Sequence, residues 1–83
     1  MKKFFFTFGG KYRHEQHPAG GHPDGWFEIT VPNGRHAHEL ARMVMFTICD
    51  DRWAGCYTET DFRPDLYPKG CLAQFEVTVQ RKP

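Results

Sequence analysis

Hydrophobic and polar residues alternate along three segments of the chain, at 3–8, 26–31 and 71–80. Alternation with a period of two predicts a β-strand with one buried face, because successive side chains of a strand point to opposite sides. Residues 52–58 predict a further, shorter strand. The pattern therefore indicates four strands, two on either side of a region with different spacing.

Residues 35–48 have the spacing of a helix, because apolar side chains recur at intervals of three and four residues. The predicted buried stripe consists of Ala37, Leu40, Ala41, Val44 and Ile48. Asn33 is a candidate N-cap, since its side chain can accept hydrogen bonds from the first amides of the helix. Three further apolar residues predict either a wider core or a contact surface: Met43, Met45 and Phe46.

The order of these elements predicts the α+β class: a small β-β-α-β-β domain with one helix packed on a mostly antiparallel four-stranded sheet. Residues 1–83 form a single domain on this reading, because a second domain would have too little chain for a core. The two periods together select the predicted core, which is Phe4, Phe6, Phe8, Phe27, Ile29, Val31, Leu40, Val44, Ile48, Phe75, Val77 and Val79.

A long loop rich in His, Gly and Pro is predicted at 9–25. Loops of this length are uncommon in compact domains and are often functional. His14, His17 and His22 would supply three imidazole ligands to an open zinc site, although neither paired cysteines nor an H-E-x-x-H helix is present. We expect these histidines to be neutral and hydrogen-bonded within the protein, and binding of a metal or small ligand by this loop is the alternative function.

Charge and residue types exclude several classes of function. The chain has 11 Lys and Arg against 10 Asp and Glu, and a net charge of +1 excludes an acidic DNA mimic. It also provides no general attraction to nucleic acid. The chain contains no serine, which eliminates Ser-based catalytic triads, and no Gly-rich phosphate loop joins a strand to a helix. We expect a non-enzymatic protein without a cofactor.

The cysteines and the hydropathy predict the compartment. The number of cysteines is 3, and an odd number without a C-x-x-C pair argues against a secreted disulfide framework. No apolar run approaches the roughly 20 residues of a membrane span, and no signal peptide is recognised. We therefore expect a cytoplasmic protein that does not bind membranes.

Aromatic residues make up 16% of the chain, more than a sheet with one helix readily covers. Exposed Trp, Tyr and Arg side chains are typical of the centres of protein–protein interfaces. The candidate partner-binding residues are Tyr12, Arg13, Trp26, Trp53, Tyr57 and Tyr67. The sheet face opposite the helix also needs a cover, which the 9–25 loop, the 59–70 segment or another subunit would provide.

The N-terminal strand interleaves cations with aromatic rings, in the run Lys2-Lys3-Phe4-Phe5-Phe6-Thr7-Phe8. Cations and stacked rings are the elements of single-stranded nucleic-acid binding, which is therefore a third candidate function. The pattern of an RRM is not matched, because a second aromatic strand motif is missing. Nucleic acid is accordingly less favoured as a partner than protein.

Short motifs are spread along nearly the whole chain. They are Thr7-Phe8-Gly9, His14-x-x-His17-Pro18, His22-Pro23-Asp24-Gly25-Trp26, Trp53-Ala54, Tyr57, Phe62 and Tyr67-Pro68-x-Gly70. In these motifs the chain resembles a group of small uncharacterised proteins of actinobacteria and their bacteriophages. It departs from that group where their W-A-F-x-Y strand reads Trp53-Ala54-Gly55-Cys56-Tyr57. The resemblance implies a cytoplasmic accessory protein of a phage or prophage, and it assigns no functional residue.

The sequence as a whole favours a small accessory protein that binds a host or phage protein partner. We expect it to act as a homo-oligomer, in the simplest case a homodimer, in the cytoplasm of the host cell.

Overall fold

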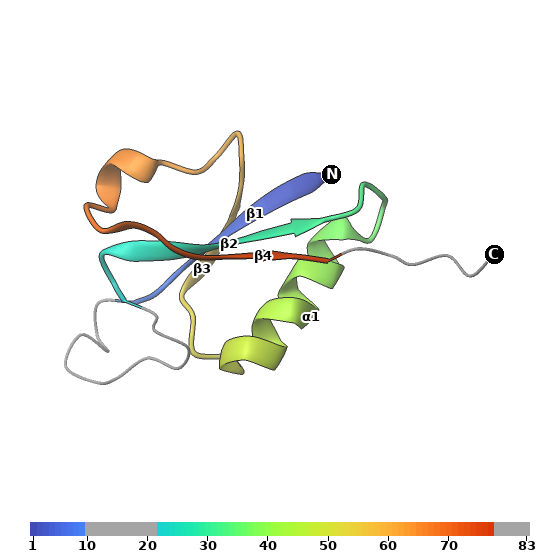
Figure 1. The fold of residues 1–83 in the computed structure, drawn as a ribbon, viewed down its shortest axis with the longest axis horizontal. Coiled ribbons are helices and arrows are strands. Elements are labelled where there is room, and N and C mark those ends of the chain that lie inside the picture. The colour runs from blue at the N-terminus through green and yellow to red at the C-terminus, as the bar shows by residue number, and fades with distance from the viewer. Residues whose placement is uncertain (10–21, 78–83) are drawn as a thin grey trace.

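The computed structural model describes residues 1–9 and 22–77 of the chain. Its elements are β1 (Lys2–Thr7), β2 (Gly25–Val31), α1 (Ala37–Cys49), β3 (Gly55–Thr58), the short 3-10 helix η3 (Pro64–Leu66) and β4 (Gly70–Glu76). The strands form one 4-stranded sheet in the order β3-β1-β2-β4, with α1 on one face (Figure 1). The predicted α+β class and the predicted order of elements are confirmed.

The sheet is mixed. β1 pairs antiparallel with both β2 and β3, whereas β2 pairs parallel with β4. A parallel pair needs a crossover connection, and residues 32–69 provide it. Gly25 lets the two parallel strands approach, because a Cβ atom there would lie 2.8 Å from the carbonyl oxygen of Gly70.

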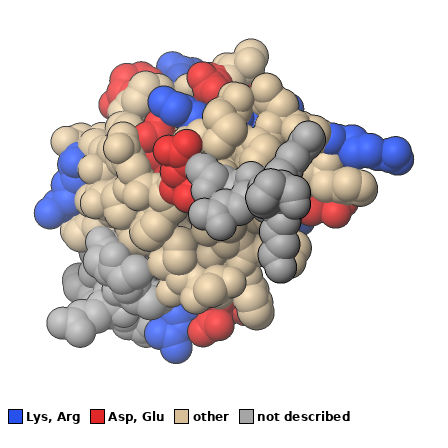
Figure 2. Space-filling model, turned by 45° about the vertical axis from the view of Figure 1, so that its right-hand side comes forward, with Lys and Arg blue, Asp and Glu red and all other residues tan. Residues whose placement is uncertain are grey.

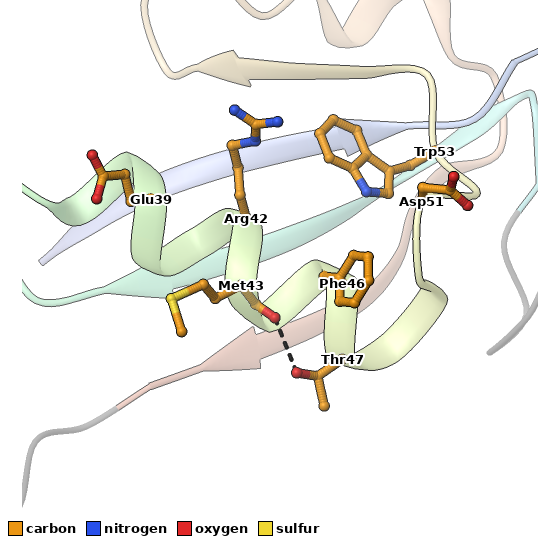
Figure 3. A pocket seen from close by; sticks show the side chains of 7 residues that line it. All are labelled: Glu39, Arg42, Met43, Phe46, Thr47, Asp51 and Trp53. Carbon is orange, nitrogen blue, oxygen red and sulfur yellow. Dashed lines mark hydrogen bonds between the residues drawn. The ribbon is translucent and has the colours of Figure 1, made fainter.

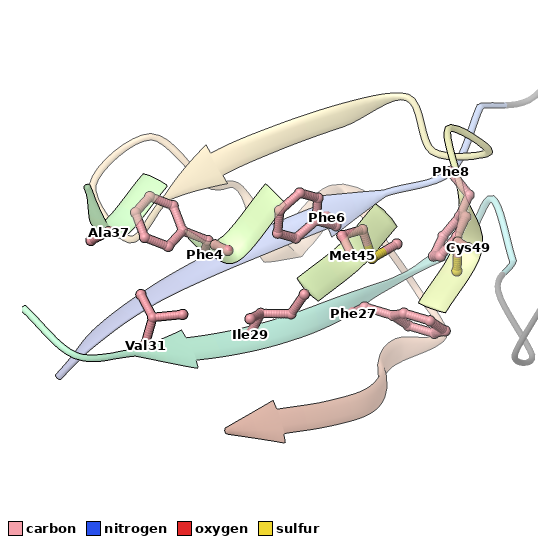
Figure 4. Packing of buried hydrophobic residues seen from close by; sticks show 10 residues of the cluster. Phe4, Phe6, Phe8, Phe27, Ile29, Val31, Ala37, Met45 and Cys49 are labelled. Carbon is pink, nitrogen blue, oxygen red and sulfur yellow. The ribbon is translucent and has the colours of Figure 1, made fainter. Parts of the chain in front are cut away.

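The helix-covered side of the sheet, called the helix face below, carries the core. Six predicted core residues of β1, β2 and the residue that follows β1 are buried: Phe4, Phe6, Phe8, Phe27, Ile29 and Val31 (Figure 4). The rings of Phe8 and Phe27 meet edge to face, with their centroids 4.9 Å apart. The alternation in the first two strands therefore predicts the buried face correctly.

The buried stripe predicted for the helix is correct at Ala37 and Ala41 and is displaced by part of a turn in its other three residues. The fully buried residues of α1 are Ala37, Ala41, Met45 and Cys49, whereas Leu40, Val44 and Ile48 are only partly buried beside them. Two alanines on the contact line let the helix axis come close to the sheet. The larger side chains of Leu40, Val44 and Ile48 form a parallel row on one side of that line, where they pack against the edge of the core.

The predicted face of the last strand is correct in its second half only. The register shifts between Trp26 and Phe27, so that Cys71 pairs with Trp26 and Ala73 pairs with Phe27. This irregularity puts Cys71 on the opposite face, where it is exposed, although the alternation predicts it in the core. Phe75 and Val77 pack against the core and are partly buried. Val79, the last predicted core residue, lies outside the described residues.

Helix α1 and the third strand begin two or three residues later than predicted. Helix α1 begins at Ala37 after His36, which makes no side-chain capping bond, so Asn33 is not the N-cap. Residues 34–37 instead form a turn that is closed by a bond from the amide of Ala37 to the carbonyl of Gly34, 3.2 Å long. The third strand begins at Gly55 rather than at residue 52.

The face opposite the helix is called the aromatic face. Segment 59–70 crosses it, and Phe62 is 9% exposed there. The ring of Phe62 stacks on that of Phe5 with centroids 4.5 Å apart, and the ring of Trp26 meets it edge to face at 5.0 Å. Figure 1 shows η3 and α1 on opposite sides of the sheet. Among the described residues, the 59–70 segment provides the cover that the sequence requires, and most of the 9–25 loop lies outside them.

Candidate protein-binding surface

The outer side of α1 carries large apolar side chains. Met43 is 67% exposed and Phe46 is 59% exposed, and the two lie three residues apart on the same side of the helix. Met45, the third apolar residue outside the predicted stripe, is fully buried. The surplus of apolar residues in the helix is therefore divided between the core and the surface.

These two side chains border an open hollow beside the helix, called the α1 hollow. Its volume is about 580 Å³, and its lining is Glu39, Arg42, Met43, Phe46, Thr47, Asp51 and Trp53 (Figure 3). Volumes of this size are typical of small-molecule pockets, but those enclose most of their ligand. An open hollow bordered by exposed side chains is better suited to a side chain of another protein.

The wall of the hollow is rigid because Trp53 is held on two sides. Its indole meets Phe6 of the core edge to face, with centroids 5.0 Å apart at an interplanar angle of 88°. The guanidinium of Arg42 lies over the indole, with its central carbon 5.7 Å from the ring centroid. Within the described part of the chain no ion pair involves Arg42, so its donors remain available to a partner.

The other candidate partner-binding residues lie on a different face. Trp26, Tyr57 and Tyr67 gather around Phe62 on the aromatic face, at centroid distances of 5.0, 6.0 and 5.4 Å. Their rings mainly cover the sheet through contacts with Phe62 of the same chain. Trp53 is the only one of the four described candidates that lies on the helix face. The structure thus divides the candidates between two surfaces.

Each of the two tryptophans contributes a buried indole N–H. No acceptor for Nε1 of Trp26 or of Trp53 exists among the residues described. A buried donor without a partner costs about 1–3 kcal/mol. Both rings are therefore held by their ring contacts rather than by hydrogen bonds.

Most of the 9–25 loop lies outside the described residues, including Tyr12, Arg13, His14 and His17. His22 is described, and its Nδ1 accepts a hydrogen bond of 3.0 Å from the amide of Asp24. This bond agrees with the prediction of a protein-bonded histidine at that position. In the ranges 1–9 and 22–77, no group of three His, Cys, Asp or Glu side chains is placed to hold a metal ion.

The rings of β1 are not available to stack on bases. Phe4 and Phe6 are buried in the core, and Phe5 is stacked under Phe62. Lys3 is paired with Glu28, at 3.6 Å from Nζ to Oε1. Figure 2 shows basic and acidic side chains interspersed on the face that it draws rather than gathered by sign. These contacts remove the aromatic part of the proposed nucleic-acid motif.

The surroundings of the three thiols favour their neutral form. Burial raises the pKa of Cys56 to about 11, and the nearby Arg42 only partly opposes this. Burial and the neighbouring Asp50 raise the pKa of Cys49, and burial and Glu28 raise that of Cys71. A catalytic cysteine needs a lowered pKa, because the thiolate is the reactive form. The pKa values of all three cysteines are raised instead.

Sequence reasoning identifies Trp53, Met43 and Phe46 but does not bring them together. Arg42 is missed, although it lies eleven residues before Trp53 at a helix position next to the buried line. The usable signal is an Arg flanked by exposed apolar helix residues, the residue types that interfaces favour. Among the described residues, no helix is long and apolar enough to cross a membrane.

Comparisons of the chain with protein-family models, with curated proteins and with solved structures find no match.

Proposed function

We propose that this chain is a non-enzymatic accessory protein that binds a protein partner through the α1 hollow. On the resemblance to proteins of actinobacteria and their phages, the partner is a host or phage protein and the compartment is the host cytoplasm. Self-association, which the sequence also predicts, is a separate property that does not use the hollow.

The observation that carries the proposal is the exposure of Met43 and Phe46, at 67% and 59%. Each leaves a large apolar side chain in water although the helix has a well-filled inner side. Burying a side chain of this kind in an interface contributes roughly 1.5–3 kcal/mol. Met, aromatic residues and Arg are also the types enriched at interfaces.

The lining determines the chemistry of the partner. Met43 and Phe46 would contact an apolar side chain, and Arg42 would donate to an acceptor oxygen on the same partner. Glu39 and Asp51 lie at the rim of the hollow. They disfavour a partner that presents only carboxylates. The fitting partner is therefore a protein segment with one apolar anchor next to a single carboxylate or carbonyl oxygen.

Site-specific photo-crosslinking tests the proposal in the native host. A photoreactive phenylalanine analogue replaces Phe46 in one variant and Leu66 in a matched control, which is 62% exposed on the other side of the sheet. We expect a protein adduct of defined mass from position 46 and none from position 66. Adding Met43→Gln to the first variant should abolish the adduct. Equal adducts from both positions, or none from position 46, would contradict the proposal.

A further inference from the structure

Strand β4 forms an open edge of the sheet. It occupies the last place in the strand order, and no described strand lies beyond it (Figure 4). The amide of Val77 donates to Thr30 of β2 at 2.9 Å, so the backbone of Val77 faces inward. Because this direction alternates along a strand, the backbone groups of Gln74 and Glu76 face outward from the edge. No described strand uses these donors and acceptors, so a further strand can pair with them.

This edge lacks the usual protection against pairing. Natural edge strands carry lysine, proline, inward charges or bulges that prevent association. Residues 73–77, with the sequence Ala-Gln-Phe-Glu-Val, contain no lysine and no proline. Their one charged residue is Glu76. The irregularity in the register lies before Ala73, so the second half of β4 is regular. The opposite edge, β3, has only four residues.

We propose that a second copy of this chain pairs with residues 73–77, antiparallel and about a two-fold axis that passes through Phe75. In this register Gln74 lies opposite Glu76 of the second copy, and Ala73 lies opposite Val77. The two Phe75 rings meet across the axis on the helix face. Two 4-stranded sheets thereby become one continuous sheet with both helices on the same side.

Side-chain chemistry selects this register over its neighbours. An axis through Glu76 would place the two Glu76 carboxylates directly opposite each other, which is destabilising. An axis through Gln74 would place the Glu76 carboxylate opposite the apolar Leu72, which offers it no hydrogen-bond donor. With the axis through Phe75, Gln74 of each copy lies opposite Glu76 of the other. The side-chain amide of Gln74 donates its first hydrogen to Glu28, and its second hydrogen is placed to reach the carboxylate of that Glu76. The strand is thus complementary to itself, which a two-fold interface requires.

The apolar surface beside β4 also favours a second copy over an unrelated extended peptide. Phe75 and Val77 are only partly buried, although both pack against the core. The ring of Phe75 touches Phe27 from one side, with centroids 5.6 Å apart. Pairing about the axis would cover its other side with an identical ring. The α1 hollow lies toward β3, where Arg42 meets Trp53, and takes no part.

Sedimentation equilibrium on the full chain tests the proposal. We expect a mass twice that of the 9.7 kDa chain at micromolar concentrations. A monomer at every concentration up to about 100 μM would overturn the proposal, since such a concentration corresponds to a free energy of association of only about −5 to −6 kcal/mol.

A charge exchange tests the register. Gln74→Glu places a carboxylate opposite Glu76 of the second copy, and we expect the dimer to weaken roughly tenfold because the repulsion occurs twice. Adding Glu76→Gln restores the complementary pair and should restore the dimer. In the monomer the new carboxylate at position 74 lies beside Glu28 in both variants. A loss that the second substitution does not rescue would therefore overturn the register.

Two further variants separate this interface from the α1 hollow. Gln74→Pro removes an outward amide and should abolish the dimer while circular dichroism shows a folded chain. Phe46→Gln should leave the dimer unchanged. A dimer that survives Gln74→Pro but is lost in Phe46→Gln would overturn the β4 proposal and assign self-association to the helix.

Discussion

The two faces of the sheet are covered in different ways. On the helix face, α1 seals a core whose strand residues are almost wholly buried, down to 0% exposure for Phe27. On the aromatic face, one ring from an irregular segment performs this task, because Phe62 touches Phe5, Trp26, Tyr57 and Tyr67. The rest of that face is polar, with Glu28 bonded to Lys3 and Gln74.

The difference shows that a small sheet can be closed on its second side without a second layer. A helix distributes its contacts over several turns, whereas Phe62 concentrates them in a single side chain. We therefore expect the helix face to determine whether the chain folds. The aromatic face should determine whether segment 59–70 stays in place.

The largest effect is expected from breaking the helix face. Phe27→Ala removes a fully buried ring between Phe8 and Phe75 and should lower the free energy of unfolding by about 3–5 kcal/mol. Urea denaturation measures this value. Phe46→Ala removes the same ring from an exposed position and should change it by less than about 0.5 kcal/mol. Similar losses in both variants would show that the helix face is not the core.

Breaking the aromatic face should cost less. Phe62→Ala removes one ring and its aromatic contacts, and we expect a loss of about 2–3 kcal/mol, below the roughly 3–5 kcal/mol of a Phe in a rigid core, because the irregular segment 59–70 can relax into the space that is left. Phe62→Leu keeps apolar volume and should recover about half of this. Hydrogen exchange should become faster in residues 59–70 before it does in β1 and β2. A uniform increase across the chain would contradict the separation of the two faces.

The junction of the covering segment with β4 should show a smaller effect. Gly70 has a φ of +72°, a conformation that a side chain disfavours by about 1–2 kcal/mol. Gly70→Ala should therefore destabilise the chain by that amount. Gly34→Ala is the matched control, since no atom lies within 4 Å of the added Cβ. Thermal unfolding of both variants compares them, and equal melting temperatures would contradict the expectation.

The smallest expected effect is on the pH dependence of stability, and it tests whether the Cys56 thiol is buried on the helix face. Burial raises the pKa of Cys56 from 9.0 to about 11, so the fold favours the neutral thiol. Its contribution to stability is fully present below about pH 9 and is lost as the pH rises toward 11. The free energy of unfolding should fall less steeply over this interval in Cys56→Ala than in the unchanged chain. The slope of Cys71→Ala, whose thiol is exposed on the aromatic face, should change less.

The period of two is sufficient to predict the buried side of β1 and β2, because both strands face one helix along their whole length. The same rule fails for Cys71, since one irregular position between Trp26 and Phe27 reverses the side on which it lies. Parallel pairing of β4 is equally hidden, because it depends on the path of the crossover and not on the strand itself.

The helix shows a second limit. The predicted stripe contains Ala37 and Ala41, which do lie on the contact line because small residues allow close packing. It misses Met45 and Cys49, which complete that line in place of the larger Leu40, Val44 and Ile48. For the candidate site, sequence predicts Trp53 and the surplus of Met43 and Phe46. It does not predict that Arg42 lines the same hollow. Nor does it predict that Trp26, Tyr57 and Tyr67 pack around Phe62 on the other face of the sheet. Those contacts join distant segments, and no local pattern encodes them.

The path from β2 to β4 has a consequence for how the chain reaches this state. After β2 the chain crosses the helix face as α1, forms the far edge as β3, returns across the aromatic face past Phe62, and ends at the near edge as β4. It thereby encircles the pair of central strands once. The pairing of β2 with β4 begins with Gly25 and Gly70, which are 45 positions apart in the sequence. Such distant contacts slow folding, since the entropy of closing the loop is lost first. We expect β4 to dock last and to leave first, so the outer edge of β2 stays unpaired longer than that of any other strand while the chain folds.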